Sequence, residues 1–238
     1  MATHSQAVLG LSPDFYLRLG DAAGPTAVDA SGNGKNGTSG AGLVYAKPGS
    51  LTGDADTCVE FTRTNVAERI DVSYTVGNVQ TIAGRYWRAD IANDHILFGS
   101  TSGATSCFLC LRPEGKIAFA PAGTDIVTWE SASPGIEQWV SWAVKFDLGA
   151  ANTAELVING VSKGVKECAT NLNAPGTFQI GETASAALLF KGFQDEVWAK
   201  ASLVSTASLL QIHEIAVNGP TVSSSQFPLS RRNRIVPF

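Results

Sequence analysis

The sequence is poor in charged residues, methionine, histidine and long apolar runs. Charged residues make up 16% of the 238 residues, and there are one methionine and three histidines; an average domain has roughly 25% charged residues. A helical bundle carries many Glu and Lys residues on its solvated faces, so the low charge argues against that class. No apolar run approaches the ~20 residues that span a bilayer, so we expect no membrane insertion.

The chain also lacks a strong electrostatic field. Its net charge of -4 provides no basic surface to attract nucleic acid, so we expect no nucleic-acid partner. Residues 1–10 contain neither a basic segment nor a long apolar segment, so we expect no secretory signal. The protein would then be made in a cytoplasm and reach the cell exterior by another route, such as assembly into a particle.

The four cysteines do not form a recognisable redox or zinc motif. Cys107 and Cys110 have the spacing C-x-x-C, but they lie in an apolar run typical of a strand. Residues three apart on a strand point to opposite faces, and no histidine is near enough to complete a zinc site. We therefore expect buried thiols that pack as small apolar side chains.

What the sequence does contain is a series of short apolar runs between turn signals, as in an all-β sandwich. Asn159-Gly160 is the strongest hairpin signal, and Pro113-Glu114-Gly115 separates two other runs. The sequence does not alternate strands with helices, so a parallel sheet is not expected. The predicted strands are Phe15–Leu19, Cys58–Thr62, Arg69–Tyr74, Thr81–Arg88, His95–Gly99, Cys107–Arg112, Lys116–Ala120, Gln138–Phe146, Ala154–Ile158, Gly164–Cys168, Thr177–Ile180 and Gly192–Ala199.

One segment, Ser205–Ala216, has the apolar spacing of a helix. Ser205 or Thr206 can cap its start, and Asn218-Gly219-Pro220 ends it. Many short strands and one C-terminal helix predict an all-β fold, a two-sheet antiparallel jelly-roll sandwich. We place this domain at residues 12–218, with an N-terminal arm at 1–11 and an extended C-terminal tail at 219–238.

In residues 13–38, a strand that ends in Y-x-R-L is followed by a D-x-S-G-N-G-x-x-G-T loop. This opening resembles that of laminin G-like, or concanavalin A-like, lectin domains, and it is similar to that of tailed-phage minor tail proteins. The similarity covers about residues 12–218 and implies the same jelly-roll fold. Four later blocks follow in the family's order: Gly49–Asp54 with Val59–Phe61, Trp139–Val144 with Phe146-Asp147, Val157–Gly160, and Ile180-Gly181 with Phe190–Val197.

The resemblance also implies a candidate site for a structural calcium ion. In the family, the D-x-S-G-N-G loop often approaches the D-E-V block around such an ion, so Asp29, Asn33 and Asp195 are candidate ligands together with backbone carbonyls. The loop is not an EF-hand, because its twelfth position is Gly40 rather than Glu. The alternative is an Asx turn that needs no metal.

An enzymatic function is not expected. The fold hosts glucanases, in which two carboxylates face each other about 5–5.5 Å apart for retaining chemistry. The nearest acidic run here is Asp195-Glu196, and adjacent residues of a regular strand point to opposite faces. The G-x-S-x-G match at residues 160–164 follows a hairpin signal instead of the strand-turn-helix that a nucleophile elbow needs.

The tryptophans divide into two groups. Four of them match core positions of the family, and we expect them to pack in the core: Trp87, Trp139, Trp142 and Trp198. Trp129 has no counterpart and precedes a Ser-Pro-Gly loop, so it is the candidate for stacking on a sugar or a partner protein. The alternative is a rim residue that covers the edge of the sandwich.

The C-terminal tail combines Arg231, Arg232 and Arg234 with the terminal Phe238. We expect these side chains to contact a partner; a solvated tail is the alternative.

The resemblance and the missing signal together predict a non-enzymatic virion protein, a phage tail or capsid surface component that joins other virion proteins, forms a homo-oligomer and contacts host-surface glycans. The alternative function is a carbohydrate-binding lectin module, either soluble or attached to another assembly.

Overall fold

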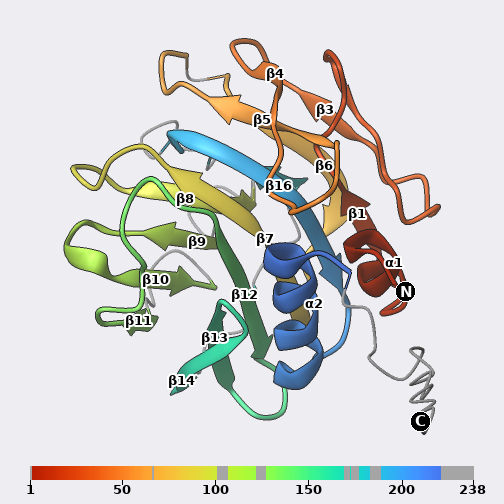
Figure 1. The fold of residues 1–238 in the computed structure, drawn as a ribbon. Helices are drawn as coiled ribbons and strands as arrows, with labels where there is room; N and C mark the ends of the chain where they lie inside the picture. Colours follow the sequence, from red (N-terminus) through yellow and green to blue (C-terminus); the bar gives the residue numbers. More distant parts are fainter. Residues whose placement is uncertain are drawn as a thin grey trace, which may run out of the picture.

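The computed structural model describes residues 2–65, 67–100, 107–121, 127–168, 172, 177–182 and 189–220. Two sheets face one another across an apolar core (Figure 1). Every pairing among the described strands is antiparallel, which confirms the predicted sandwich. Among the described residues, no helix is both long enough and apolar enough to cross a membrane.

Sheet A has the order β14-β13-β12-β7-β16-β5-β4, and β1 also pairs with β16. Sheet B has the order β11-β10-β9-β8-β15-β6-β3-β2. The strands of sheet A are β1 (Phe15–Leu17), β4 (Val44–Pro48), β5 (Thr57–Phe61), β7 (Val79–Arg88), β12 (Val140–Asp147), β13 (Thr153–Ile158), β14 (Val161–Glu167) and β16 (Gly192–Lys200). Those of sheet B are β2 (Thr26–Ala27), β3 (Gly37–Ser39), β6 (Ile70–Thr75), β8 (His95–Ser100), β9 (Phe108–Leu111), β10 (Ile117–Ala120), β11 (Val127–Trp129) and β15 (Thr177–Ile180).

Alternation along the central strands of sheet A separates the core from the outer face. On β7, Ile82 and Tyr86 point into the core, and on β12 Val140, Trp142 and Val144 do the same. The residues between them point away from the sandwich. All twelve predicted strands overlap observed ones, whereas β2, β3, β4 and β11 were not predicted.

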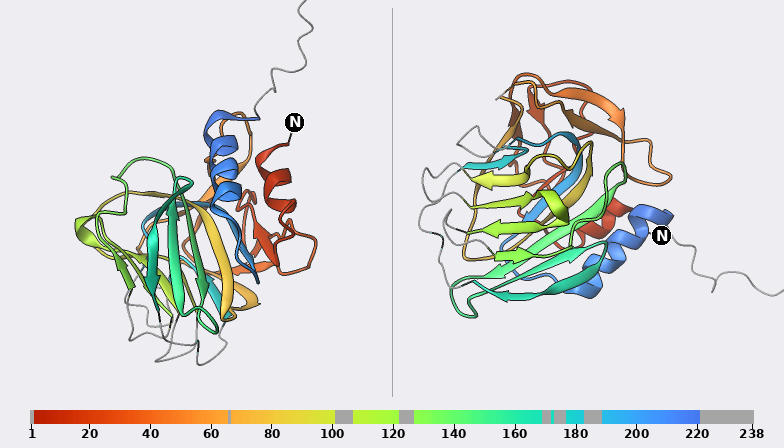
Figure 2. Two further views of the ribbon diagram at one scale, coloured as in Figure 1. Left: turned by 90° about the horizontal axis from the view of Figure 1, so that it is seen from below. Right: turned by 90° about the vertical axis from the view of Figure 1, so that its left-hand side faces the viewer.

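Two helices cover one part of the outer face of sheet A (Figure 2). Helix α2 (Thr206–Asn218) confirms the predicted helix: the Ser205 hydroxyl accepts a hydrogen bond from the Ser208 amide at its start. Helix α1 (His4–Leu9) was not predicted and lies in the N-terminal arm, where Thr3 and Gln6 form a capping box. The helices enclose a second apolar cluster with the sheet: Val8, Tyr16, Ala83, Ala143, Val157, Trp198, Val204, Leu209 and Ile212.

All four cysteines are buried, as expected. Cys107 belongs to the core between the sheets, and Cys110 belongs to a small apolar cluster with Ile96, Phe108 and Ala120. The two thiols thus lie in different apolar clusters, which confirms that they point to opposite faces of the sheet.

Candidate functional site

Three aromatic side chains, Trp87, Trp139 and Phe193, gather on the part of the outer face of sheet A that the helices leave open. We call them the aromatic cluster. Trp87 and Phe193 lie opposite each other on β7 and β16, with ring centroids 5.0 Å apart. Trp139, just before β12, packs 6.2 Å from Phe193. All three side chains are half-buried, so each ring keeps part of its surface in contact with solvent.

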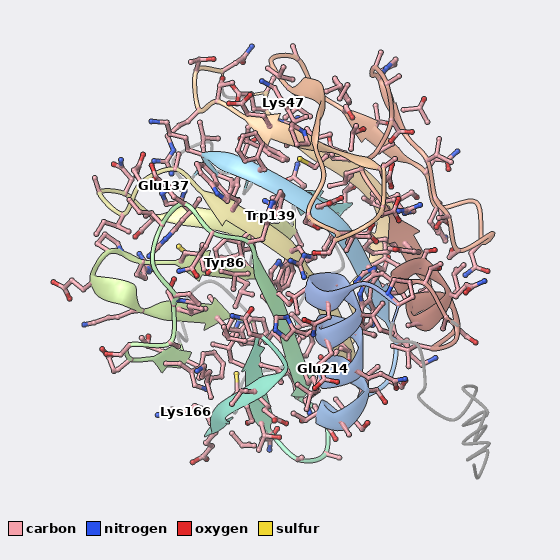
Figure 3. All side chains as sticks on the ribbon, in the orientation of Figure 1. Lys47, Tyr86, Glu137, Trp139, Lys166 and Glu214 are labelled. Atoms are coloured by element: carbon pink, nitrogen blue, oxygen red, sulfur yellow. The ribbon has the colours of Figure 1, made fainter. Side chains whose placement is uncertain are left out.

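The chain on either side of Trp139 is fixed to β7. The Glu137 amide donates a hydrogen bond to the Arg88 carbonyl, and Val140 pairs with Tyr86 in the sheet. Figure 3 shows Trp139 on the same side of sheet A as α2, between that helix and the β4–β5 hairpin. The ring is therefore positioned before any ligand arrives, which lowers the entropic cost of binding.

An ion pair borders the aromatic cluster. Glu60 on β5 lies directly opposite Phe193 on β16, and the Lys47 ammonium on β4 is 2.6 Å from a Glu60 carboxylate oxygen. Lys47 is 34% exposed and Glu60 is 28% exposed, so both charged groups remain open to solvent. The region thus combines apolar ring surface with exposed hydrogen-bonding groups.

A row of polar side chains, the buried Arg85 and the half-buried Ser141 and His213, lies between the aromatic cluster and α2. The Arg85 guanidinium donates to the Ser141 hydroxyl at 2.8 Å, and that hydroxyl lies 3.0 Å from Nδ1 of His213 on α2. Burial lowers the pKa of Arg85 to about 10, and burial and the Arg85 charge lower the pKa of His213. Because the hydroxyl accepts from Arg85, its own proton is available to a neutral His213 ring. This row anchors α2 to the sheet.

The acidic pair Asp195-Glu196 does not follow the geometry expected from the sequence. A β-bulge shifts the register between β16 and β7, so Asp195 faces Arg85 while Trp198 faces Ala83. Glu196 has a positive φ of 55° in this bulge. Both carboxylates therefore lie on the outer side of sheet A, and the expectation that they point to opposite faces was wrong.

The acidic pair is nevertheless closed to substrate. Asp195 is 2% exposed and accepts a hydrogen bond from the Ser50 amide, and Glu196 is 1% exposed beneath α1. Burial, with Glu196 nearby, raises the pKa of Asp195. Glu196 borders a cavity of about 20 Å³ between sheet A and α2, which has room for little more than one water molecule, so the arrangement does not support glycoside hydrolysis.

Asp29 uses its carboxylate oxygens to hold its own loop. One oxygen accepts from the amides of Tyr16 and Ser31, and the other accepts from the Ser31 hydroxyl and the Lys35 amide. Burial raises the pKa of Asp29, but these hydrogen bonds outweigh it, and the pKa is lowered. This is the Asx-turn geometry that the sequence left open as the alternative to a metal loop.

The other two candidate calcium ligands are engaged elsewhere. The Asn33 side chain donates through its amide nitrogen to the carbonyls of Pro13 and Asp14, and Asp195 shares no hydrogen-bond partner with Asn33 or Asp29 in the described residues. No group of three or more His, Cys, Asp or Glu side chains suited to a metal occurs there either. The hydrogen bonds of Asp29, Asn33 and Asp195 do not bring the three side chains together, and calcium binding stays a prediction.

Asn33 instead borders a polar groove of about 860 Å³ at one end of the sandwich. Within it, the Tyr74 hydroxyl lies 3.1 Å from an Asp14 carboxylate oxygen and 2.7 Å from the Gln80 amide oxygen, either of which can accept its single proton. Among the described residues that line the groove, hydrogen-bonding groups prevail and Tyr74 is the one aromatic residue. Its lining also includes Lys35, Ser73, Thr75, Gly77, Thr177 and Ala201.

Trp129 is a core residue. Its side chain is 2% exposed, and its indole N–H donates to the Gly164 carbonyl at 2.8 Å. The interpretation as a stacking residue is corrected accordingly, because no ring face is open to a ligand. The burial favours the alternative that this residue closes the sandwich edge.

The other tryptophans divide differently from the expectation. Trp142 and Trp198 are 2% exposed, which confirms their core assignment, but Trp87 and Trp139 belong to the half-buried aromatic cluster. Strand alternation alone could have placed these two outside, since each lies one position from an inward-facing residue.

The tail residues Arg231, Arg232, Arg234 and Phe238 lie outside the described residues.

No family model matches this chain. No curated protein matches its sequence. Solved structures match the fold: domain 4 of AbnA, a GH43 extracellular arabinanase from Geobacillus stearothermophilus, in complex with arabinotriose, has a TM-score of 0.66 and 15% identity, over 84% of this chain and 98% of that one. The botulinum neurotoxin type G receptor binding domain has a TM-score of 0.62 and 11% identity.

A third similar structure is the botulinum neurotoxin serotype D ligand binding domain in complex with N-acetylneuraminic acid, with a TM-score of 0.59 and 12% identity. The alignments with the two neurotoxin domains cover 85% and 89% of this chain, and the chain spans 51% of each. At these identities the likeness establishes the β-sandwich fold.

Proposed function

We propose that this chain is a non-enzymatic, carbohydrate-binding β-sandwich module. The observation that carries the proposal is the aromatic cluster of Trp87, Trp139 and Phe193 on the open part of sheet A. A sugar ring has apolar C–H faces that pack on aromatic rings, and hydroxyls that need polar partners at the rim. The aromatic cluster offers the rings, and the Lys47–Glu60 ion pair offers the partners.

The similar structures support this proposal. One is a domain solved with arabinotriose and another is a ligand binding domain solved with N-acetylneuraminic acid. The burial of Asp195 and Glu196 supports the non-enzymatic part, because a hydrolase needs its carboxylates at the substrate.

Replacing Trp139 with alanine should weaken glycan binding roughly tenfold or more, because the stacking surface shrinks. The melting temperature should stay close to that of the wild type, since the side chain is half-buried and outside the main core. Binding is measured by calorimetric titration with a ligand first identified on a glycan array.

Ile136→Ala is the matched control, because Ile136 is a 40% exposed apolar residue on the same loop. Lys35→Ala probes the polar groove at the end of the sandwich. If Trp139→Ala binds normally while Lys35→Ala does not, the binding site lies in that groove and the role of the aromatic cluster is wrong.

The finer form of the proposal places this module on a virion, as a phage tail or capsid surface component that contacts host glycans. Its support is the similarity of residues 13–38 to tailed-phage minor tail proteins. The proposed partners of the tail, through Arg231, Arg232, Arg234 and Phe238, are other virion proteins or further copies of this chain.

Deleting residues 221–238 should leave a folded protein that no longer joins the particle, since the deletion spares both sheets and both helices. Purified particles are probed for the truncated protein by immunoblot, beside full-length chain supplied at the same level. Incorporation at the full-length level would refute a role of the tail in assembly.

A further inference from the structure

The ring geometry of the aromatic cluster limits the size of what it can bind. Trp87 and Phe193 are tilted by 59°, and Trp139 and Phe193 by 42°. Rings at such angles do not form a continuous flat strip along which a chain of sugars could lie. They form a short, faceted surface that matches one sugar ring.

The surroundings of the aromatic cluster further limit the size of the ligand. On one side stands α2, joined to the sheet through the contact between Ser141 and His213. On another side lies the loop that precedes β12, anchored by the bond from Glu137 to Arg88 (Figure 1). The exposed direction across the sheet leads from Phe193 to Glu60, which is its neighbour on β5.

The Lys47–Glu60 pair has hydrogen-bonding capacity beyond its 2.6 Å contact. An ammonium group has three N–H donors and a carboxylate has two acceptor oxygens, so one ion pair occupies only part of either group. Two adjacent sugar hydroxyls meet this arrangement well, because one can donate to the carboxylate while its neighbour accepts from the ammonium. Such charge-assisted bonds are about twice as strong as those between neutral groups.

The charges of the pair also indicate the class of ligand. Lys47 and Glu60 compensate each other, so this pair carries no excess positive charge that would favour an anionic sugar. A neutral sugar with two adjacent hydroxyls gains both hydrogen bonds without leaving a charge unpaired.

We propose that the aromatic cluster binds a single, neutral sugar unit whose C–H face packs on Trp87, Trp139 and Phe193 and whose adjacent hydroxyls bind Lys47 and Glu60. This inference rests on the proposed carbohydrate-binding function and specifies its ligand: one unit of a glycan, at its end, instead of an extended chain. Affinity then depends on that unit and its hydroxyls.

The test titrates the full chain with neutral methyl glycosides, with arabino-oligosaccharides of one to four units, with deoxy analogues lacking either adjacent hydroxyl, and with N-acetylneuraminic acid. Affinity for the preferred neutral sugar should stay within about threefold along the length series. Loss of one adjacent hydroxyl, E60Q or K47M should each weaken binding roughly tenfold, as expected for a charge-assisted hydrogen bond. N-acetylneuraminic acid should bind more weakly than the neutral sugar.

K163M is the matched control, because Lys163 lies on the exposed edge strand β14, away from the aromatic cluster; it should bind like the wild type. A melting curve for every variant separates lost binding from lost folding. A tenfold gain for each added unit, or normal binding by both E60Q and K47M while Trp139→Ala fails, overturns this inference and leaves the proposed function standing. No saturable binding to any glycan on a broad array overturns both.

Discussion

Replacing Trp129 with alanine should lower the free energy of unfolding by about 3–5 kcal/mol, the usual cost of truncating a buried tryptophan. The ring is 2% exposed and belongs to the main core. Its indole N–H bonds to the Gly164 carbonyl, and this contact joins β11 at the edge of sheet B to β14 at the edge of sheet A. The substitution removes apolar contacts and also leaves that carbonyl without its donor. Urea denaturation followed by circular dichroism measures the change.

Two further variants separate these contributions. Trp129→Phe keeps most of the apolar contacts and loses the hydrogen bond, so its cost should be smaller than that of the alanine variant. Val165→Ala alters the neighbour of Gly164 at a side chain that is 60% exposed, and its cost should stay within about 0.5 kcal/mol. A Trp129→Ala protein that unfolds like the wild type but no longer binds glycans would return Trp129 to a ligand-stacking role.

The strands were predictable because their signals are local. Each strand is marked by alternating apolar residues and by turn residues such as Asn159-Gly160, which lie within a few positions of one another. The unpredicted β2 and β3 are two and three residues long; β2 pairs with β3, and β3 depends on pairing with the more distant β6. Helix α1, with six residues, is too short to form alone and is stabilised by packing of Val8 on the sheet.

The candidate site was harder to predict than the fold. Whether an outward-facing residue is buried depends on what covers that face, and α2 covers Ala83 and Ala143 but not Trp87. The sequence does not indicate how far the helices extend over the outer face of sheet A, so it predicts Trp87 and Trp139 in the core. The orientation of Glu196 depended on a bulge at a residue with no special preference for positive φ.

The residues assigned from family resemblance also show what resemblance leaves undetermined. The D-x-S-G-N-G loop has the sequence expected of the family, yet Asp29 binds the amides of its own loop and of Tyr16. An oxygen that accepts hydrogen bonds from N–H groups and an oxygen that binds a cation come from the same residue types at the same spacing. Only the positions of the N–H donors, which the tertiary fold sets, distinguish a hydrogen-bonded loop from a cation-binding loop.

Replacing Glu196 with alanine should cost about 3 kcal/mol of unfolding free energy, since removal of one partner from a buried polar network leaves the others uncompensated. The Glu196 carboxylate is 1% exposed and accepts from the Tyr16 hydroxyl and from Arg18, and it lies 3.1 Å from Nδ1 of His4 on α1. Arg18 keeps its contacts with Asp54 and Asp56, which places the expected cost at the lower end of the usual range.

The loss should be greatest at α1, because His4 is 5% exposed and Glu196 is the acidic group it contacts from the sheet. Hydrogen exchange of the amides in residues 4–9 should therefore accelerate more than that of β12, and Glu196→Gln, which keeps the side-chain volume, should fall between the alanine variant and the wild type. Asp54→Asn removes a 33% exposed partner of Arg18 and should cost no more than about 1 kcal/mol. Equal acceleration in α1 and β12 would contradict a local role, and would make Glu196 a support of the whole sandwich instead of the anchor of its first helix.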